Sequence, residues 1–157
     1  MKAFLIVILS LSFNIIALGQ TFNWTDTSFI KGSKRTIRPY WSMDNLIRLN
    51  DDSNTRAIMD TLIQFLIKNP LVKIEIDCHL GQSPAFKLEN LSQYRAENIK
   101  DYLHNIAGID TTRIITKGYE FTKPIISQDT INSDKKNERE KVWIYQCINE
   151  RADIIIN

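Results

Sequence analysis

The sequence predicts an α/β (α+β) fold in which a four-stranded mixed sheet is covered on one face by two helices. Two stretches with apolar residues at helical spacing are interspersed with stretches in which apolar and polar residues alternate one by one. Because helices connect successive strands, at least part of the sheet is expected to be parallel. The expected element order is β-α-β-α-β-β.

The first expected elements are a strand and a helix. Residues 36–43 are rich in β-branched and aromatic side chains, and Pro39 suggests an edge position or a bulge. Residues 49–54 have turn chemistry that also offers helix caps. Residues 55–68 carry a single apolar stripe at helical spacing, and Asn69-Pro70 ends this helix.

The middle of the chain predicts a strand, a helix and a strand. Residues 72–77 alternate apolar and charged side chains, which is typical of a half-buried strand. A loop is expected at residues 81–86, followed by an amphipathic helix over 92–106 that Gly108 closes in the left-handed conformation. Residues 113–118 are expected to form the third strand.

The last third of the chain predicts one more strand. Residues 127–139 are polar and are expected to form a loop. Residues 141–148 alternate in side-chain character, which predicts the final strand. Residues 151–157 include three consecutive isoleucines and are expected to form a tail, as an added edge strand or a docking segment.

The N-terminus predicts an exported protein. Lys2 precedes an apolar run that is interrupted by polar residues and is shorter than the roughly 20 residues of a spanning helix. Ala17-Leu18-Gly19 offers small residues for a signal peptidase, so residues 1–19 are expected to be a cleaved signal peptide, the alternative being an uncleaved anchor. Residues 20–35 are polar and are expected to form a linker.

Composition limits the function classes. Removal of residues 1–19 leaves 157 − 19 = 138 residues, enough for one domain, which is expected at residues 36–150. The net charge of the whole chain is only +2, which offers no electrostatic basis for nucleic-acid binding. No membrane-spanning segment is expected after signal cleavage. No cofactor is expected. A hydrolase is disfavoured, because the sequence shows no paired carboxylates at useful spacing, no metal-ligand cluster and no Ser/His arrangement.

Three stretches carry recognisable motifs. Residues 65–79 (FLIKNPLVKIEIDCH) contain a helix end, Asn-Pro, a strand and a following His. Residues 91–103 (LSQYRAENIKDYL) contain L-S-x-x-R-A, and residues 108–125 (GIDTTRIITKGYEFTKPI) end in Pro-Ile. In this order and spacing they resemble the OmpA-like C-terminal domain family, which binds peptidoglycan and has Gly-His-Thr-Asp after the strand. The resemblance implies a last strand antiparallel between the first and second strands.

The resemblance also implies a function without catalysis. The expected protein is a periplasmic module associated with the cell outer membrane or cell wall, where it binds peptidoglycan non-covalently. The alternative is a degenerate scaffold that has lost this ligand and binds a protein partner in an envelope assembly. In the family, an Asp and an Arg hold the charged head group of the peptide's diamino acid, a pairing that suits a zwitterion.

The ligand site carries over only in part. Arg95 matches the ligand-binding Arg and His79 matches the motif His, and backbone N–H groups around Leu91, Ser92 and Gln93 are expected to assist. However, Gly81 replaces the motif Asp.

Several alternatives stay open at the site. Arg95 could instead pair with Glu89 or Asp77 as a surface residue, and either acid could replace the missing Asp. His79 could tie the strand end to a neighbouring backbone. The family's Asn-Arg-Arg-Val, which opens the last strand, is placed at residues 139–142 (REKV) and is altered there.

The two cysteines, Cys78 and Cys147, are expected not to pair. The strand order that the resemblance implies places Cys147 opposite Val72, about 20 Å from Cys78 at roughly 3.3 Å per residue. A disulfide requires Cα atoms within about 7 Å. A nucleophilic pair of Cys78 and His79 is also disfavoured, because adjacent strand residues point to opposite faces.

Overall fold

The computed structural model describes residues 20–41, 52–81, 89–134 and 139–157. The expected signal peptide, half of the turn at 49–54 and most of the loop at 81–86 lie outside these residues. The described strands are β1 (Lys34–Ile37), β2 (Ile74–His79), β3 (Ile114–Gly118) and β4 (Arg151–Ile156). The helices are α1 (Ser53–Lys68), α2 (Leu91–Ala107), α3 (Gln128–Asp134) and α4 (Arg139–Asn149), with a 3-10 turn η1 at Thr111–Arg113.

The strands form one mixed sheet in the order β1-β4-β2-β3. Strand β4 is antiparallel to both of its neighbours, with Asp153 opposite Thr36 on β1 and opposite Asp77 on β2. Strands β2 and β3 are parallel, as their helical crossover requires. The predicted fold class is confirmed, and so is the position of the last strand between the first and second.

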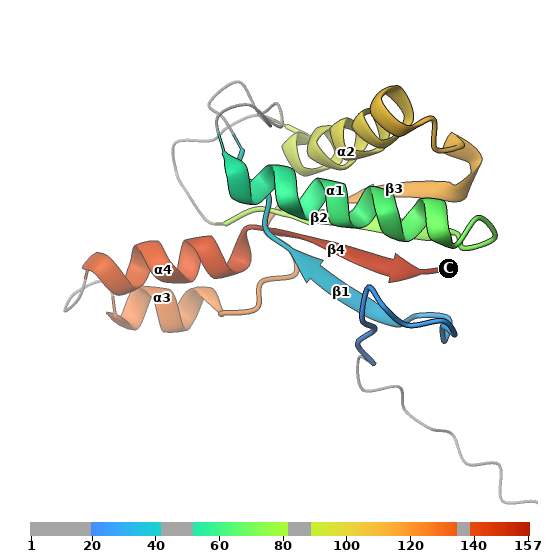
Figure 1. Ribbon diagram of the computed structural model, residues 1–157. Coiled ribbons are helices and arrows are strands. Elements are labelled where there is room, and N and C mark those ends of the chain that lie inside the picture. The colour runs from blue at the N-terminus through green and yellow to red at the C-terminus, as the bar shows by residue number, and fades with distance from the viewer. Residues whose placement is uncertain (1–19, 42–51, 82–88, 135–138) are drawn as a thin grey trace, which may run out of the picture.

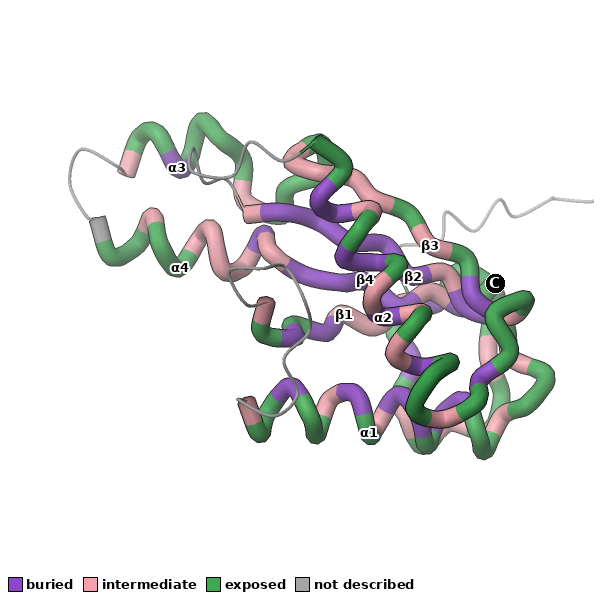
Figure 2. The backbone as a smooth tube through the Cα atoms, turned by 90° about the horizontal axis from the view of Figure 1, so that it is seen from above, coloured by how far each residue is buried: buried purple, intermediate pink, exposed green. Residues whose placement is uncertain are grey.

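Helices α1 and α2 cover one face of the sheet (Figure 1). The predicted apolar stripes form the contact, and their residues interdigitate with alternate residues of β2 and β4. Figure 2 shows that burial is concentrated along these two central strands. The fully buried large side chains of this core include Met59, Leu62, Leu66, Ile74, Ile76, Ile99, Leu103 and Ile154.

Both covering helices have ends that the sequence predicts. The Asp52 carboxylate caps α1 by accepting a 2.8 Å hydrogen bond from the Thr55 backbone N–H. Gly108 ends α2 with φ +64°, a left-handed conformation that favours glycine, and its N–H donates to the His104 carbonyl. The predicted role of Gly108 is therefore confirmed.

The segment expected to be a linker, residues 20–35, is packed against the domain. The Phe22 side chain is buried, and its ring stacks on Phe65 of α1 with a centroid distance of 5.4 Å. The Lys34 N–H donates to the Gln20 carbonyl, and β1 begins at Lys34. Most residues of this segment, the N-terminal arm (residues 20–35), are polar, so its composition predicted a loose linker. A few aromatic residues among them attach it to the domain.

The prediction of a last strand at residues 141–148 is wrong, because these residues lie within α4. The last strand is β4, in the segment expected to be a tail. Its residues Ala152, Ile154 and Ile156 face the covering helices, so small and branched side chains fill the space beneath them.

Two further differences follow from this correction. Residues 128–134 form helix α3 within the region expected to be a polar loop, and α3 and α4 together extend from one end of the sheet (Figure 1). Cys147 lies on α4 and not opposite Val72, whereas Cys78 faces Ala152 across the sheet. Both thiols are free in the structure.

Candidate ligand-binding site

A pocket of about 260 Å³ lies where β2 ends, between the start of α2 and helix α4. Leu80 and Gly81 follow β2 on one side, and Leu91 and Arg95 come from the first turns of α2. The opposite wall is formed by Trp143, Gln146, Cys147 and Glu150. The site therefore combines three segments that are far apart in the sequence.

Arg95 is the buried cation of this pocket. It lies on the inward stripe of α2 and its side chain is only 3% exposed. Its Nη1 donates to Glu150 Oε1 at 2.5 Å, and its guanidinium lies 4.8 Å from the ring centroid of Trp41. Its Nε has no hydrogen-bond partner among the described residues. A buried guanidinium with a free donor is a natural group for binding an anion.

The surroundings of Gly81 explain why this position has no Asp side chain. A Cβ atom at this position would lie 2.3 Å from the backbone carbonyl oxygen of Gln146 in α4. No side chain fits there while α4 occupies its place, because the obstructing atom belongs to the backbone. The replacement of Asp by Gly is thus linked to the packing of α4 against the end of β2.

The start of β4 corrects the position of a second motif. The strand is preceded by Asn149 and Glu150 and begins with Arg151 and Ala152. The Asn-Arg-Arg-Val pattern therefore falls at residues 149–152 and not at 139–142, and Glu150 occupies the place of its first Arg. The last strand and its opening motif were both predicted in the segment that forms α4, so the two errors are one and the same misassignment.

The residues predicted to bind the ligand separate into two groups. Leu91 and Arg95 line the pocket. Ser92 is engaged elsewhere, because its N–H and its Oγ both donate to Glu120 Oε1, at 3.0 and 2.8 Å. Gln93 lies against β3, where its backbone nitrogen would be 2.3 Å from a Cβ on Gly118.

His79 lies on the other face of the sheet. Its Nε2 is 3.4 Å from Asp153 Oδ2, and its ring stacks on Tyr119 with a centroid distance of 5.2 Å. The expected tie from His79 to a neighbouring backbone is therefore replaced by a side-chain contact. Asp77 shares this face, so it is not the partner of Arg95, and the structure gives that position to Glu150.

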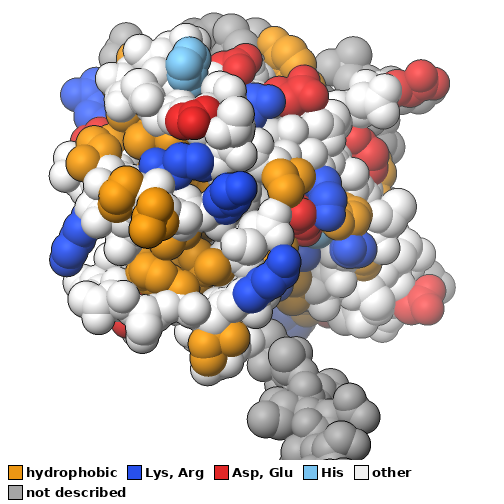
Figure 3. All heavy atoms as spheres, turned by 90° about the vertical axis from the view of Figure 1, so that its right-hand side faces the viewer, with side chains coloured by type: hydrophobic (Ala, Val, Ile, Leu, Met, Phe, Trp, Pro, Cys, Tyr) orange, Lys and Arg blue, Asp and Glu red, His pale blue; other side chains and the backbone are white. Residues whose placement is uncertain are grey.

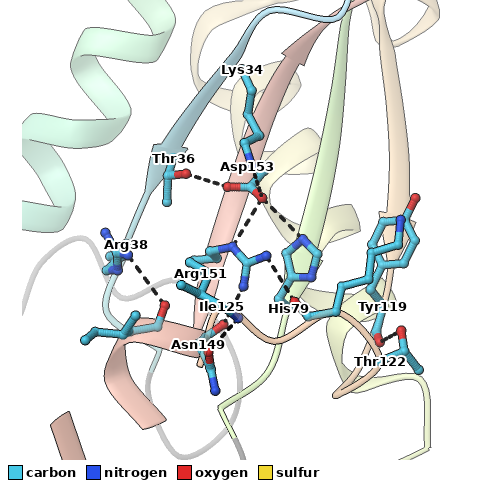
Figure 4. A network of polar contacts seen from close by, with 12 residues as sticks. Lys34, Thr36, Arg38, His79, Tyr119, Thr122, Ile125, Asn149, Arg151 and Asp153 are labelled. Carbon is cyan, nitrogen blue, oxygen red and sulfur yellow. Dashed lines mark hydrogen bonds and ion pairs between the residues drawn. The ribbon is translucent and has the colours of Figure 1, made fainter. Parts of the chain in front are cut away.

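Asp153 is the centre of a polar network on the uncovered face of the sheet (Figure 4). It accepts hydrogen bonds from Thr36 Oγ1 at 2.6 Å and from Lys34 Nζ and Arg151 Nε, both at 3.2 Å. Burial alone would raise the pKa of Asp153. The contacts with His79 and Thr36 and the charges of Arg151 and Lys34 outweigh burial and hold this pKa below its usual range.

Asp77, directly opposite Asp153, is in the reverse situation. Its Oδ1 is buried without a hydrogen-bond partner among the described residues. Burial and the neighbouring charge of Glu75 raise the pKa of Asp77 to about 7, against the opposing effect of Lys117. On this face, therefore, the carboxylate of Asp153 is firmly ionised, whereas the carboxyl of Asp77 titrates near neutral pH.

A second, more open groove lies beside the N-terminal arm. It has a volume of about 520 Å³ and is lined by residues of the arm and of α1, among them Trp24, Phe65 and Ile67. Figure 3 views the end of the molecule where α1 finishes, and hydrophobic side chains gather there beside Lys and Arg. Among the described residues that line this groove, none is a buried charged residue comparable to Arg95.

The described part of the chain holds neither a metal-binding cluster nor a membrane-spanning helix. Its His, Cys, Asp and Glu residues form no group of three or more that could hold a metal ion. No helix in this described part of the chain has both the length and the apolar character that crossing a membrane requires.

The fold and the pocket define a class of protein: a small two-layer α/β module with one arginine-based pocket at the end of its sheet. A model of the OmpA family matches residues 45–138, which is more than half of the chain. The chain belongs to the OmpA family. No curated protein matches the sequence.

Several solved structures share this fold. The cell wall anchor of the T6SS from Pseudomonas aeruginosa is 21% identical, with 82% of each chain covered and a TM-score of 0.59. The periplasmic domain of Helicobacter pylori MotB is 16% identical, covering 83% of this chain and 78% of that one, with a TM-score of 0.59. The peptidoglycan-associated lipoprotein from Burkholderia pseudomallei is 18% identical, covering 78% and 90%, with a TM-score of 0.55.

Sequence reasoning found Arg95 but missed its surroundings. The wall formed by α4 was not predicted, because residues 141–148 were assigned to a strand. One available signal was the sequence Asn149-Glu150-Arg151-Ala152, which fits the strand-opening motif better than residues 139–142. A correct assignment of this motif would have placed Glu150 at the site.

Proposed function

We propose that this chain is a non-catalytic module of the bacterial cell envelope that binds peptidoglycan non-covalently. Its place would be the periplasm, in association with the cell outer membrane or cell wall, after removal of residues 1–19. Membership of the OmpA family supports the general function, and the similar structures include a protein described as a cell wall anchor.

The observation that carries the proposal is the buried guanidinium of Arg95 at the base of the pocket. A guanidinium presents several donors in a fixed plane, and this geometry matches a carboxylate. Its Nε has no partner within the described residues, so a donor is available to a ligand. We propose Arg95 and Leu91 as ligand-contacting residues. Ser92, Gln93 and His79 would support the fold around the pocket, given their contacts.

The chemistry around the cysteines supports a function without catalysis. Burial raises the pKa of the Cys78 thiol, which disfavours the thiolate that nucleophilic catalysis requires. His79 projects from the opposite face of β2, so it is not placed to act as the base for this thiol.

Co-sedimentation with purified peptidoglycan sacculi tests the proposal. Wild-type protein is expected to sediment with sacculi, and Arg95→Ala should abolish this binding. Arg95→Lys should weaken it strongly, because it keeps the charge but loses the planar donor set. Lys100→Ala is the matched control, since it removes a cation from the same helix outside the pocket.

The burial of Arg95 also affects the stability of these variants. In Arg95→Ala, loss of a buried, paired side chain should cost about 1–3 kcal/mol of folding free energy. Binding should therefore be measured well below the melting temperature of each variant. Wild-type protein that does not sediment with sacculi, or an Arg95→Ala variant that binds equally well, would contradict the proposal.

A second candidate function, a scaffold that binds a protein partner, is favoured by α4. Its Trp143 is 67% exposed and Ile144 is 46% exposed, an apolar pair on a helix that extends from the body of the domain. Failure of the wild-type protein to bind sacculi would favour this alternative.

A further inference from the structure

The charges of the pocket come from one residue of each sign. Arg95 is deeply buried, whereas the Glu150 side chain is 37% exposed. Their side chains pair directly, so the pocket as a whole is close to neutral. The other lining residues supply apolar surface, an amide and a thiol. Such a pocket suits a ligand that itself carries both charges, because each charge then finds an opposite partner.

The carboxylate reaches the pocket from an unexpected segment. The position at the end of β2, where an acidic ligand-binding side chain was expected, is Gly81 and is closed by the backbone of Gln146. The same helix leads directly into Glu150, whose carboxylate lies against Arg95. Helix α4 thus leaves no room for an acidic side chain at position 81, and the residue that follows this helix, Glu150, places a carboxylate at another wall of the pocket.

We infer that Glu150 is the ammonium-binding residue of this pocket and that Arg95 binds the carboxylate of the same zwitterionic ligand group. The inference rests on the proposed function and names the residue that completes it. Without ligand, the two side chains neutralise each other. When the zwitterion binds, one ion pair is exchanged for two, since the ammonium contacts Glu150 and the carboxylate contacts Arg95.

Differences in exposure support this division of roles. Arg95 is fixed by burial and by the ring of Trp41, so it remains in place when its partner moves. Glu150 lies between the end of α4 and the start of β4 and is partly open to solvent, so its side chain can turn toward an entering cation. Glu150 could have a competing role, in which it only blocks Arg95 from the ligand. In that case removal of its charge would strengthen ligand binding, whereas the inferred role predicts weaker binding.

The test uses soluble muropeptides released from sacculi, with the ammonium of the diamino acid either free or N-acetylated. Binding to the whole mature chain is followed by calorimetry and by intrinsic tryptophan fluorescence, since Trp143 lines the pocket. The variant is Glu150→Gln, which removes the charge but keeps the size. Glu140→Gln, at the exposed start of α4, is the matched control.

Removal of the charge on Glu150 is expected to weaken binding of the free-ammonium muropeptide about tenfold or more, whereas Glu140→Gln should bind like wild type. Acetylation should weaken binding to the wild type by a similar factor and should have little further effect on Glu150→Gln. Equal or tighter binding by Glu150→Gln would overturn the inference. The proposed function would still stand after such a result for Glu150→Gln, provided that the wild type binds and Arg95→Ala does not. If the wild type binds neither muropeptides nor sacculi, both fail.

Discussion

The two faces of the sheet are built from alternate residues of the same strands, yet they are stabilised in opposite ways. On β4, Ile154 and Ile156 point toward α1 and α2 and are buried among apolar side chains. Arg151 and Asp153, at alternate positions of the same strand, point away from these helices and are also buried, but among charges and hydrogen-bonding groups. Burial alone therefore does not distinguish the two faces.

The difference lies in how specific each contact must be. The apolar face depends on volume and shape, so different branched residues can serve the same role. The charged face depends on particular partners across strands. Asp77 and Asp153 are identical in chemistry and directly opposite in register, yet the pKa of Asp77 is raised and that of Asp153 is lowered. The partners of each carboxyl decide the direction.

The largest expected effect tests the apolar face. Ile154→Ala removes a fully buried side chain from the central strand and should lower the free energy of unfolding by about 4 kcal/mol, as measured by urea denaturation. Ile155→Ala, at the half-buried neighbouring position on the other face, should cost about 1 kcal/mol. Similar losses for the two variants would contradict the contrast between the faces.

A somewhat smaller effect tests the charged face. Asp153→Asn leaves Arg151 buried without its anionic partner and should cost about 3 kcal/mol at pH 7. Because the folded-state pKa of Asp153 lies below its unfolded value of about 3.9, its contribution is present above that pH and is lost as the pH falls through the folded pKa. The difference from wild type should therefore narrow below about pH 4. Asp101→Asn, at an exposed site on α2, should change little at any pH.

The smallest effect has the opposite sign. The pKa of Asp77 is raised to about 7, so the stability of the wild type should fall as the pH rises from about 4 through 7, while the unfolded chain ionises and the folded one resists ionisation. Asp77→Asn removes this loss and should be about 2 kcal/mol more stable than wild type at pH 8, with little difference at pH 4. Thermal melts at both pH values measure the effect. A variant that is less stable than wild type at pH 8 would show that Asp77 is held ionised by a favourable partner.

Local patterns predicted the elements that lie on the covered face. The stripes of α1 and α2, the alternation in β2 and the closing Gly108 are all confirmed. Each of these signals comes from residues within a few positions of one another, where period and capping chemistry act directly. The candidate site was predictable to the same extent, since Arg95 lies within a helix whose motif is continuous in sequence.

The sequence by itself determined the two covering helices, the parallel pair β2 and β3, and the presence of Arg95 in the second of these helices. Tertiary structure alone decided which β-prone segment became the central strand. Residues 141–148 and 151–156 both favour β structure locally, and both place branched apolar side chains at alternate positions. In the folded chain, Ala152, Ile154 and Ile156 are the residues that pack beneath the helices. The same choice turned the first segment into α4 and brought Glu150 to Arg95. The physical reason for this choice is that the stability of a central strand depends on packing and pairing with residues far apart in the chain. A local sequence pattern does not record these interactions.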